Sequence, residues 1–150
     1  MLDSYEYYKD KFKELENKFT NQQDYFEVNI PIDDRPLKDC LADQLHLENT
    51  INNLLNEICY YKNCCQTEFE SIYSNNYSNL VTDSYKDINA SEAKQIAMSD
   101  SSYIAYKKLY NKYENLYNVA KDVADVIQTR KYTLKTMADS MINGVNNQLI

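Results

Sequence analysis

The most regular feature of the sequence is a series of apolar and amphipathic positions spaced alternately three and four residues apart. These positions, here called the C-terminal stripe, are Tyr106, Leu109, Tyr113, Leu116, Ala120, Val123, Ile127, Arg130, Leu134, Met137 and Met141. Three-four alternation is typical of a helix that buries one narrow face against another helix, as in a coiled coil or helical hairpin. At about 1.5 Å per residue the stripe is roughly 50 Å long. We therefore expect a second long helix as its partner, in this chain, in a neighbouring copy, or in both.

Two amphipathic segments precede this helix. The first, residues 1–30, has large apolar side chains at helical spacing: Tyr5, Tyr8, Phe12, Leu15 and Phe19. The second, residues 37–73, keeps three-four spacing from Ile51 onward, with apolar positions Leu41, Leu45, Ile51, Leu54, Ile58, Tyr61, Cys65, Phe69 and Ile72. Pro31 and Pro36 predict a linker at 31–36, because proline disfavours helix in the residue before it. The second segment is the natural partner of the C-terminal helix.

Residues 74–100 connect the two long helices. Ser74 to Asp87 is rich in Ser, Asn and Tyr, which favours a loop. Asn89 to Glu92 has the form of a capping box that opens a short helix, and Asp100 with its neighbouring serines predicts a cap for the C-terminal helix, 101–143. The expected fold is all-α: one domain, with a long antiparallel coiled-coil-like hairpin and an N-terminal helix.

Composition agrees with this fold and limits the location of the protein. One Gly and two Pro in 150 residues leave little material for β-turns or a Gly-rich phosphate loop. A mean hydropathy of -0.69 is polar for a self-contained core, so we expect a homo-oligomer. No leader or membrane-length apolar run is visible, which predicts a cytosolic protein without membrane contact. Its four cysteines, Cys40, Cys59, Cys64 and Cys65, are then reduced thiols.

Charge is unevenly distributed along the chain. Residues 1–100 contain nine Lys or Arg and nineteen Asp or Glu, whereas residues 101–150 contain seven and four. The segment 128–138 has three cations, one aromatic residue and no acid. Lys131 and Lys135 can contact phosphates and Tyr132 can stack on a base, with Lys121 as a further candidate on the same helix. The alternative is an ordinary solvated face near a helix C-terminus, where cations are favoured.

Arg130 differs from these lysines because it lies in the stripe. Burying a guanidinium without partners costs several kcal/mol, so we expect a carboxylate or helix-end carbonyls beside it. The candidate carboxylates are Glu57, Glu68 and Glu70 of the second segment and Asp125 of a neighbouring copy. A structural role and a phosphate contact both remain open for Arg130.

Catalysis and metal binding have little support. The single histidine, His46, has no nucleophile or acid pair to act with, so no enzyme activity and no cofactor are expected. Cys59, Cys64 and Cys65 on one helix point in different directions, unlike the turn-borne cysteines of zinc sites. The tyrosines at 103, 106, 110, 113 and 117 are interpreted as packing residues in preference to residues that stack on bases.

Two stretches resemble a known family. They are Ser84 to Asp100, read Ser-Tyr-Lys-Asp-Ile-Asn-Ala-Ser-Glu-Ala-Lys-Gln-Ile-Ala-Met-Ser-Asp, and Ile127-Gln-Thr-Arg-Lys-Tyr-Thr-Leu-Lys135. Together they resemble the UvsY family of phage recombination mediators, with no gap needed between Asp100 and Arg130. The resemblance covers the C-terminal half, and its matched positions are Asp100, Ile127, Arg130, Tyr132, Leu134 and Lys135.

The resemblance implies a non-enzymatic helical protein that forms a ring in the cytoplasm of a phage-infected cell. Such a protein binds single-stranded DNA and helps a RecA-like phage recombinase to displace single-strand binding protein. By this resemblance Arg130, Lys131 and Lys135 are the phosphate ligands, while Ile127 and Leu134 pack. The chain departs from the family at residues 57–70, where one cation faces three acids in place of several cations.

Two other functions stay open. A helical structural or adaptor protein, for instance of a virion, would dock a basic protein on its acidic N-terminal part and never touch DNA. An acidic surface that mimics nucleic acid and inhibits a host enzyme is the third reading.

Overall fold

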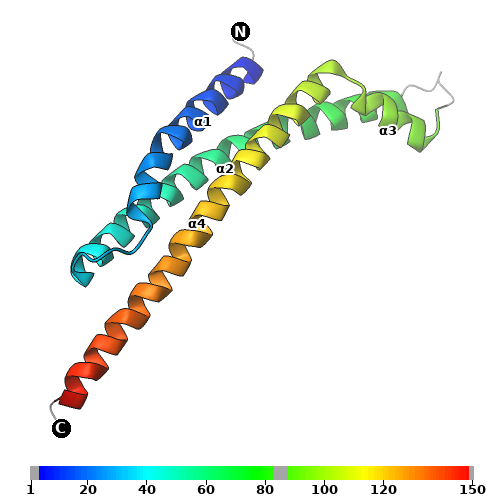
Figure 1. The fold of residues 1–150 in the computed structure, drawn as a ribbon. Helices are drawn as coiled ribbons and strands as arrows, with labels where there is room; N and C mark the ends of the chain where they lie inside the picture. The colour runs from blue at the N-terminus through cyan, green and yellow to red at the C-terminus, as the bar shows by residue number, and fades with distance from the viewer. Residues whose placement is uncertain (1–3, 83–87, 149–150) are drawn as a thin grey trace. The chain divides into compact units, whose positions relative to one another are not determined.

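The chain forms four α-helices in the residues that the computed structural model describes, 4–82 and 88–148. They are α1 (Ser4–Asn29), α2 (Leu37–Thr82), α3 (Ala90–Met98) and α4 (Ser101–Gln148), drawn in Figure 1. The described residues contain no strand, so the all-α prediction is confirmed. The long helix pair is also present, because α2 and α4 pack antiparallel. None of the described helices has the length and hydropathy that a membrane crossing needs.

The chain packs into two compact units. The first consists of Met1–Leu15 and Glu57–Tyr117, and the second of Glu16–Asn56 and Asn118–Ile150. The expectation of a single domain stays a prediction. The C-terminal stripe contributes Tyr106, Leu109, Tyr113 and Leu116 to the core of the first unit, and Ala120, Ile127, Arg130 and Leu134 to that of the second.

Aromatic side chains dominate the first unit. Tyr113 is 0% exposed, and its ring lies 5.1 Å from that of Phe12 and 6.4 Å from that of Tyr61. Its hydroxyl donates to the carbonyl oxygen of Tyr8. Phe69 of α2 contacts the rings of Tyr103 and Tyr110 of α4 edge-on. These tyrosines are packing residues, as the sequence indicates.

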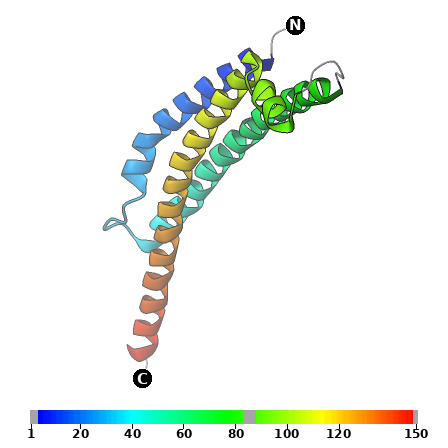
Figure 2. The same ribbon diagram turned by 90° about the vertical axis from the view of Figure 1, so that its right-hand side faces the viewer.

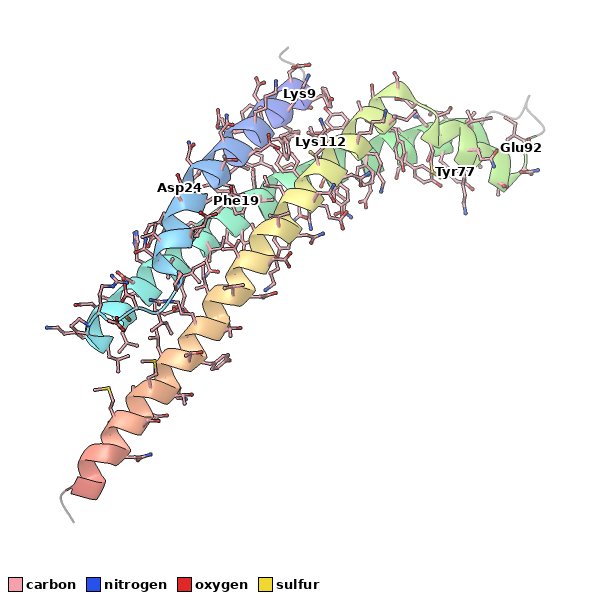
Figure 3. The ribbon with its side chains drawn as sticks, in the orientation of Figure 1. Lys9, Phe19, Asp24, Tyr77, Glu92 and Lys112 are labelled. Carbon is pink, nitrogen blue, oxygen red and sulfur yellow. The ribbon has the colours of Figure 1, made fainter. Side chains whose placement is uncertain are left out.

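The second unit contains parts of α1, α2 and α4. Phe19 and Phe26 of α1 are 4% and 3% exposed, and Phe19 points toward α2 and α4 while Asp24 points away from them (Figure 3). On α2 the buried positions are Cys40, Gln44, Leu47, Ile51, Leu54 and Leu55.

The expected positions of Leu41 and Leu45 on the packed face are wrong. Both side chains are exposed, by 43% and 62%, because the buried face of α2 starts at Cys40 and includes the polar Gln44. Three-four spacing from Ile51 backward passes through Leu47, Gln44 and Cys40, and this series excludes both leucines.

The loop predicted from residue 74 is also wrong as far as residue 82. There α2 continues without a break, with Tyr73 and Tyr77 stacked at 5.9 Å and Asn76 Nδ2 donating to Asp100 Oδ2 at 3.3 Å. The Ser- and Asn-rich stretch contains no Gly or Pro to end the helix. Residues 83–87 of the predicted loop lie outside the described residues.

The predicted helix starts are confirmed. Asn89 caps α3, where its side-chain oxygen accepts from the Glu92 amide at 2.9 Å. Asp100 caps α4, with Oδ1 accepting from the amides of Ser102 and Tyr103 at 2.8 and 3.2 Å. These bonds hold the pKa of Asp100 below its usual range, because they favour the carboxylate.

Candidate nucleic-acid interface on α4

Arg130 joins three segments of the second unit. Its Nε donates to the carbonyl oxygen of Ile30 at 2.8 Å, and its Nη1 donates to the carbonyl oxygen of Cys40 at 3.1 Å and to Gln44 Oε1 at 2.8 Å. The side chain is 4% exposed, and Nη2 is buried without a hydrogen-bond partner among the described residues. The guanidinium therefore ties the end of α1 and the start of α2 to α4.

The local structure explains why a cation belongs there. Ile30 directly follows α1, and the last carbonyls of a helix carry partial negative charge and lack partners within the helix. Gln44 extends the contact, because its Nε2 donates to the Ile127 carbonyl at 2.9 Å while its Oε1 accepts from Arg130. The expectation of helix-end carbonyls is met at Ile30, no ion pair joins Arg130 to a carboxylate among the described residues of this chain, and pairing with Asp125 of a neighbouring copy stays a prediction.

The same geometry removes Arg130 from the set of phosphate ligands. Its Nε and Nη1 donors are directed at internal acceptors, and the residue is 4% exposed. For Arg130 to contact DNA, its hydrogen bonds to Ile30, Cys40 and Gln44 would have to break. This is costly, because buried acceptors would be left unpaired. Arg130 is a structural residue in this arrangement.

The other predicted contacts share one outer face of α4. Lys131, Tyr132 and Lys135 are spaced one and three residues apart, which places them on one side of a helix. Tyr132 is 62% exposed, the Lys131 side chain is 54% exposed, and Lys135 is exposed. We call these three residues the basic face. No acid occurs in α4 between Asp125 and Asp139.

Two of the candidate lysines have carboxylate neighbours. Lys131 Nζ lies 3.4 Å from Glu48 Oε1, and Lys121 Nζ lies 3.4 Å from Asp125 Oδ1. The Lys121–Asp125 pair is solvent-exposed and contributes little free energy, whereas the Glu48 side chain is only 21% exposed and competes more strongly with a phosphate for Lys131. Lys121 is separated from the basic face by Asp125, which makes it the weaker candidate.

The remaining candidates for chemistry are one histidine and four cysteines. His46 is exposed and contacts the ring of Tyr25 at 5.3 Å. All four cysteines are free thiols, and burial raises the pKa of Cys65 to about 12. The described residues contain no group of three or more His, Cys, Asp or Glu side chains that could hold a metal ion.

Sequence reasoning did not identify Gln44 or Glu48. Gln44 lies at three-four spacing between Cys40 and Leu47. A polar residue within this otherwise apolar series was the sequence signal that could have identified it as a buried partner. Glu48 has no such signal, because its proximity to Lys131 depends on how α2 and α4 align.

Comparison with protein families, with curated proteins and with solved structures finds no match to this chain.

Proposed function

We propose that this protein is an accessory factor of phage recombination that binds single-stranded DNA as an oligomer. The observation that carries the proposal is the basic face, in which two lysines flank an exposed tyrosine without an intervening acid. The lysines would neutralise phosphates, and the tyrosine ring would stack on an unpaired base. A base inside a duplex is already stacked, so single strands are the favoured substrate.

The place of this activity in recombination rests on the resemblance to the UvsY family. In the proposed role, a ring of subunits holds the strand while a RecA-like recombinase replaces single-strand binding protein on it. Two exposed cations per subunit provide weak binding, and a protein with net charge -7 repels DNA elsewhere. Several subunits acting together would supply the missing affinity through avidity.

Fluorescence anisotropy with a labelled single strand tests the DNA-binding claim. The variant Lys131→Ala/Tyr132→Ala/Lys135→Ala removes the basic face. Its matched control is Lys94→Ala/Lys108→Ala/Tyr60→Ala, which loses the same residue types from other exposed positions. We expect the first variant to bind at least tenfold more weakly, since one stacked base alone contributes about 1–3 kcal/mol, and the control to bind like the parent protein.

Equal loss in both variants would indicate nonspecific charge attraction and contradict the assignment of the basic face. The mediator role is tested separately, by the rate at which a RecA-like recombinase assembles on strands covered with single-strand binding protein. We expect the protein to raise this rate and the basic-face variant to lose the effect.

A protein-binding adaptor is the second candidate function. The observation that favours it is the group of apolar side chains exposed near the end of α4, Met137, Met141 and Ile142, on an otherwise acidic chain. Absence of strand binding at low salt by an assembled oligomer would favour this function over the first.

A further inference from the structure

A cluster of tyrosines lies between α1 and α2 in the first unit. Tyr7 and Tyr8 come from α1, and Tyr60 and Tyr61 come from α2. The Tyr61 ring is at the centre, with ring centroids 6.2 Å from Tyr7, 6.3 Å from Tyr8 and 5.0 Å from Tyr60. Rings at these separations stabilise packing. Phenols are also readily oxidised, so the cluster brings together side chains that can react with one another.

One ring of the cluster connects the second helix to solvent. Tyr7 is 48% exposed, whereas Tyr61 is half-buried. In the part of the chain that the structure describes, several tyrosine pairs join two different helices, and Tyr7–Tyr61 is the pair with an exposed ring. An oxidant in solution can therefore reach a tyrosine that contacts a tyrosine of another helix.

The two side chains also meet at their hydroxyl groups. A hydrogen bond with Tyr7 is the largest cause that raises the pKa of Tyr61 to about 12. In a phenoxyl radical the unpaired electron is shared by the oxygen and the ortho and para ring carbons, and in tyrosine the para carbon carries the backbone link. Each ortho carbon is bonded to the carbon that carries the hydroxyl. Contact between the hydroxyl groups therefore brings the reactive carbons of the two rings together.

We propose that Tyr7 and Tyr61 are an oxidative cross-linking site that joins α1 covalently to α2. The co-reactant is a diffusible one-electron oxidant. Each phenol loses an electron and its phenolic proton, and the two radicals couple through one ortho carbon of each ring. The ortho hydrogens then leave as protons while the oxygens regain theirs. In total two C–H bonds break, one C–C bond forms, two electrons pass to two equivalents of the oxidant, and two protons pass to water.

The fold favours this link over links between copies. Two groups held beside each other in one molecule react at a far higher effective concentration than groups on separate molecules. The product holds the first part of α1 against α2 and, like a disulfide, restricts the unfolded chain. The cross-linked protein should therefore unfold at a higher urea concentration than the untreated protein. This inference is independent of DNA binding.

Photo-oxidised ruthenium tris-bipyridine with persulfate, applied to dilute protein in buffer and in urea, tests the site. After digestion and reduction, which removes disulfides, mass spectrometry should find the peptide of Tyr7 joined to that of Tyr61 with two hydrogen atoms lost. We expect this product from the folded parent, and its loss in Tyr7→Phe, in Tyr61→Phe and in urea. Tyr5→Phe and Tyr60→Phe are the matched controls, which remove a nearby tyrosine from each helix and should keep the product.

Three results would overturn the site. They are equal cross-linking of the folded and the unfolded parent, a link between these peptides that persists in Tyr7→Phe or Tyr61→Phe, and oxidation of the folded parent that yields other tyrosine products without this link. Each phenylalanine variant keeps its ring, and circular dichroism before oxidation should show the helicity of the parent protein.

Discussion

Arg130 is the residue whose role changes most between sequence and structure. Its place in the stripe predicts a buried cation with partners, and this is correct. The identity of the partners was not predictable, because Ile30 and Cys40 offer backbone carbonyls that any residue would supply. Their position depends on how the 31–36 linker folds, and this information is not contained in the spacing of side chains.

Replacing Arg130 should destabilise the protein. In Arg130→Met the carbonyl oxygens of Ile30 and Cys40 and the Gln44 amide oxygen lose a charged donor, and we expect a loss of about 3 kcal/mol in the free energy of unfolding. Arg130→Lys should also be less stable than the parent protein, because an ammonium group lacks the planar arrangement of donors of a guanidinium. Urea unfolding followed by circular dichroism measures both, with exposed Lys135→Met as the control expected within about 0.5 kcal/mol of the parent. Parent-like stability with lost DNA binding would make Arg130 a ligand after all.

A buried thiol and a partly buried phenol predict sensitivity of the fold to alkaline pH. Burial, as the largest cause, raises the pKa of Cys65 from 9.0 and that of Tyr8 from 10.0, each to about 12. Both folded-state pKa values are raised, so the stabilising contribution is complete below pH 9 and is lost as pH rises toward 12. We expect the urea midpoint of the parent protein to fall as pH rises across this range. In Cys65→Ala the midpoint, expressed relative to the variant's own value at pH 8, should fall less steeply. A midpoint independent of pH up to 11 would show that these groups ionise freely in the folded chain.

At the scale of the element, the sequence predicts helix starts well and buried faces less well. Side-chain caps such as Asn89 and Asp100 act on amides two or three residues away, so local sequence is sufficient. The face of α2 was misassigned at Leu41 and Leu45 because only apolar residues were counted, and Gln44 is polar. The extension of α2 to Thr82 was missed because its contacts, such as that between Asn76 and Asp100, involve the residue that caps α4, far away in the sequence.

The Asp100 cap gives a prediction at this scale. Asp100→Ala should lower the Tm, because the amides of Ser102 and Tyr103 lose their acceptor at the start of α4. Asp100→Asn should retain most of the Tm, since Asn is an equally good N-cap. The pKa of Asp100 is lowered in the folded state, so the difference between parent and Ala variant should shrink as pH falls through that pKa. Thermal unfolding at neutral and acidic pH measures this difference in Tm. Equal Tm values for Asp100→Ala and the parent at neutral pH would contradict the capping role of Asp100.

At the scale of the whole molecule, the positions that resemble the UvsY family can be compared with their places in the structure. Of the six matched positions, Asp100 caps a helix and Ile127, Arg130 and Leu134 are buried, which leaves Tyr132 and Lys135 exposed. Most of the signature is therefore explained by folding, and only Tyr132 and Lys135 are left for the proposed contact with DNA. Burial depends on all the packed elements together, so the sequence did not separate these two sets.

The salt dependence of strand binding, measured by anisotropy for the parent and for Lys131→Ala/Lys135→Ala, tests the proposed function most directly. Each phosphate neutralised on a single strand contributes about 0.7 to the slope of log K against log salt. The account predicts binding that weakens as salt rises, with a slope shallower by about 1.4 per engaged subunit in the variant. Equal slopes for the two proteins, or no binding by the parent at the lowest salt, would contradict it.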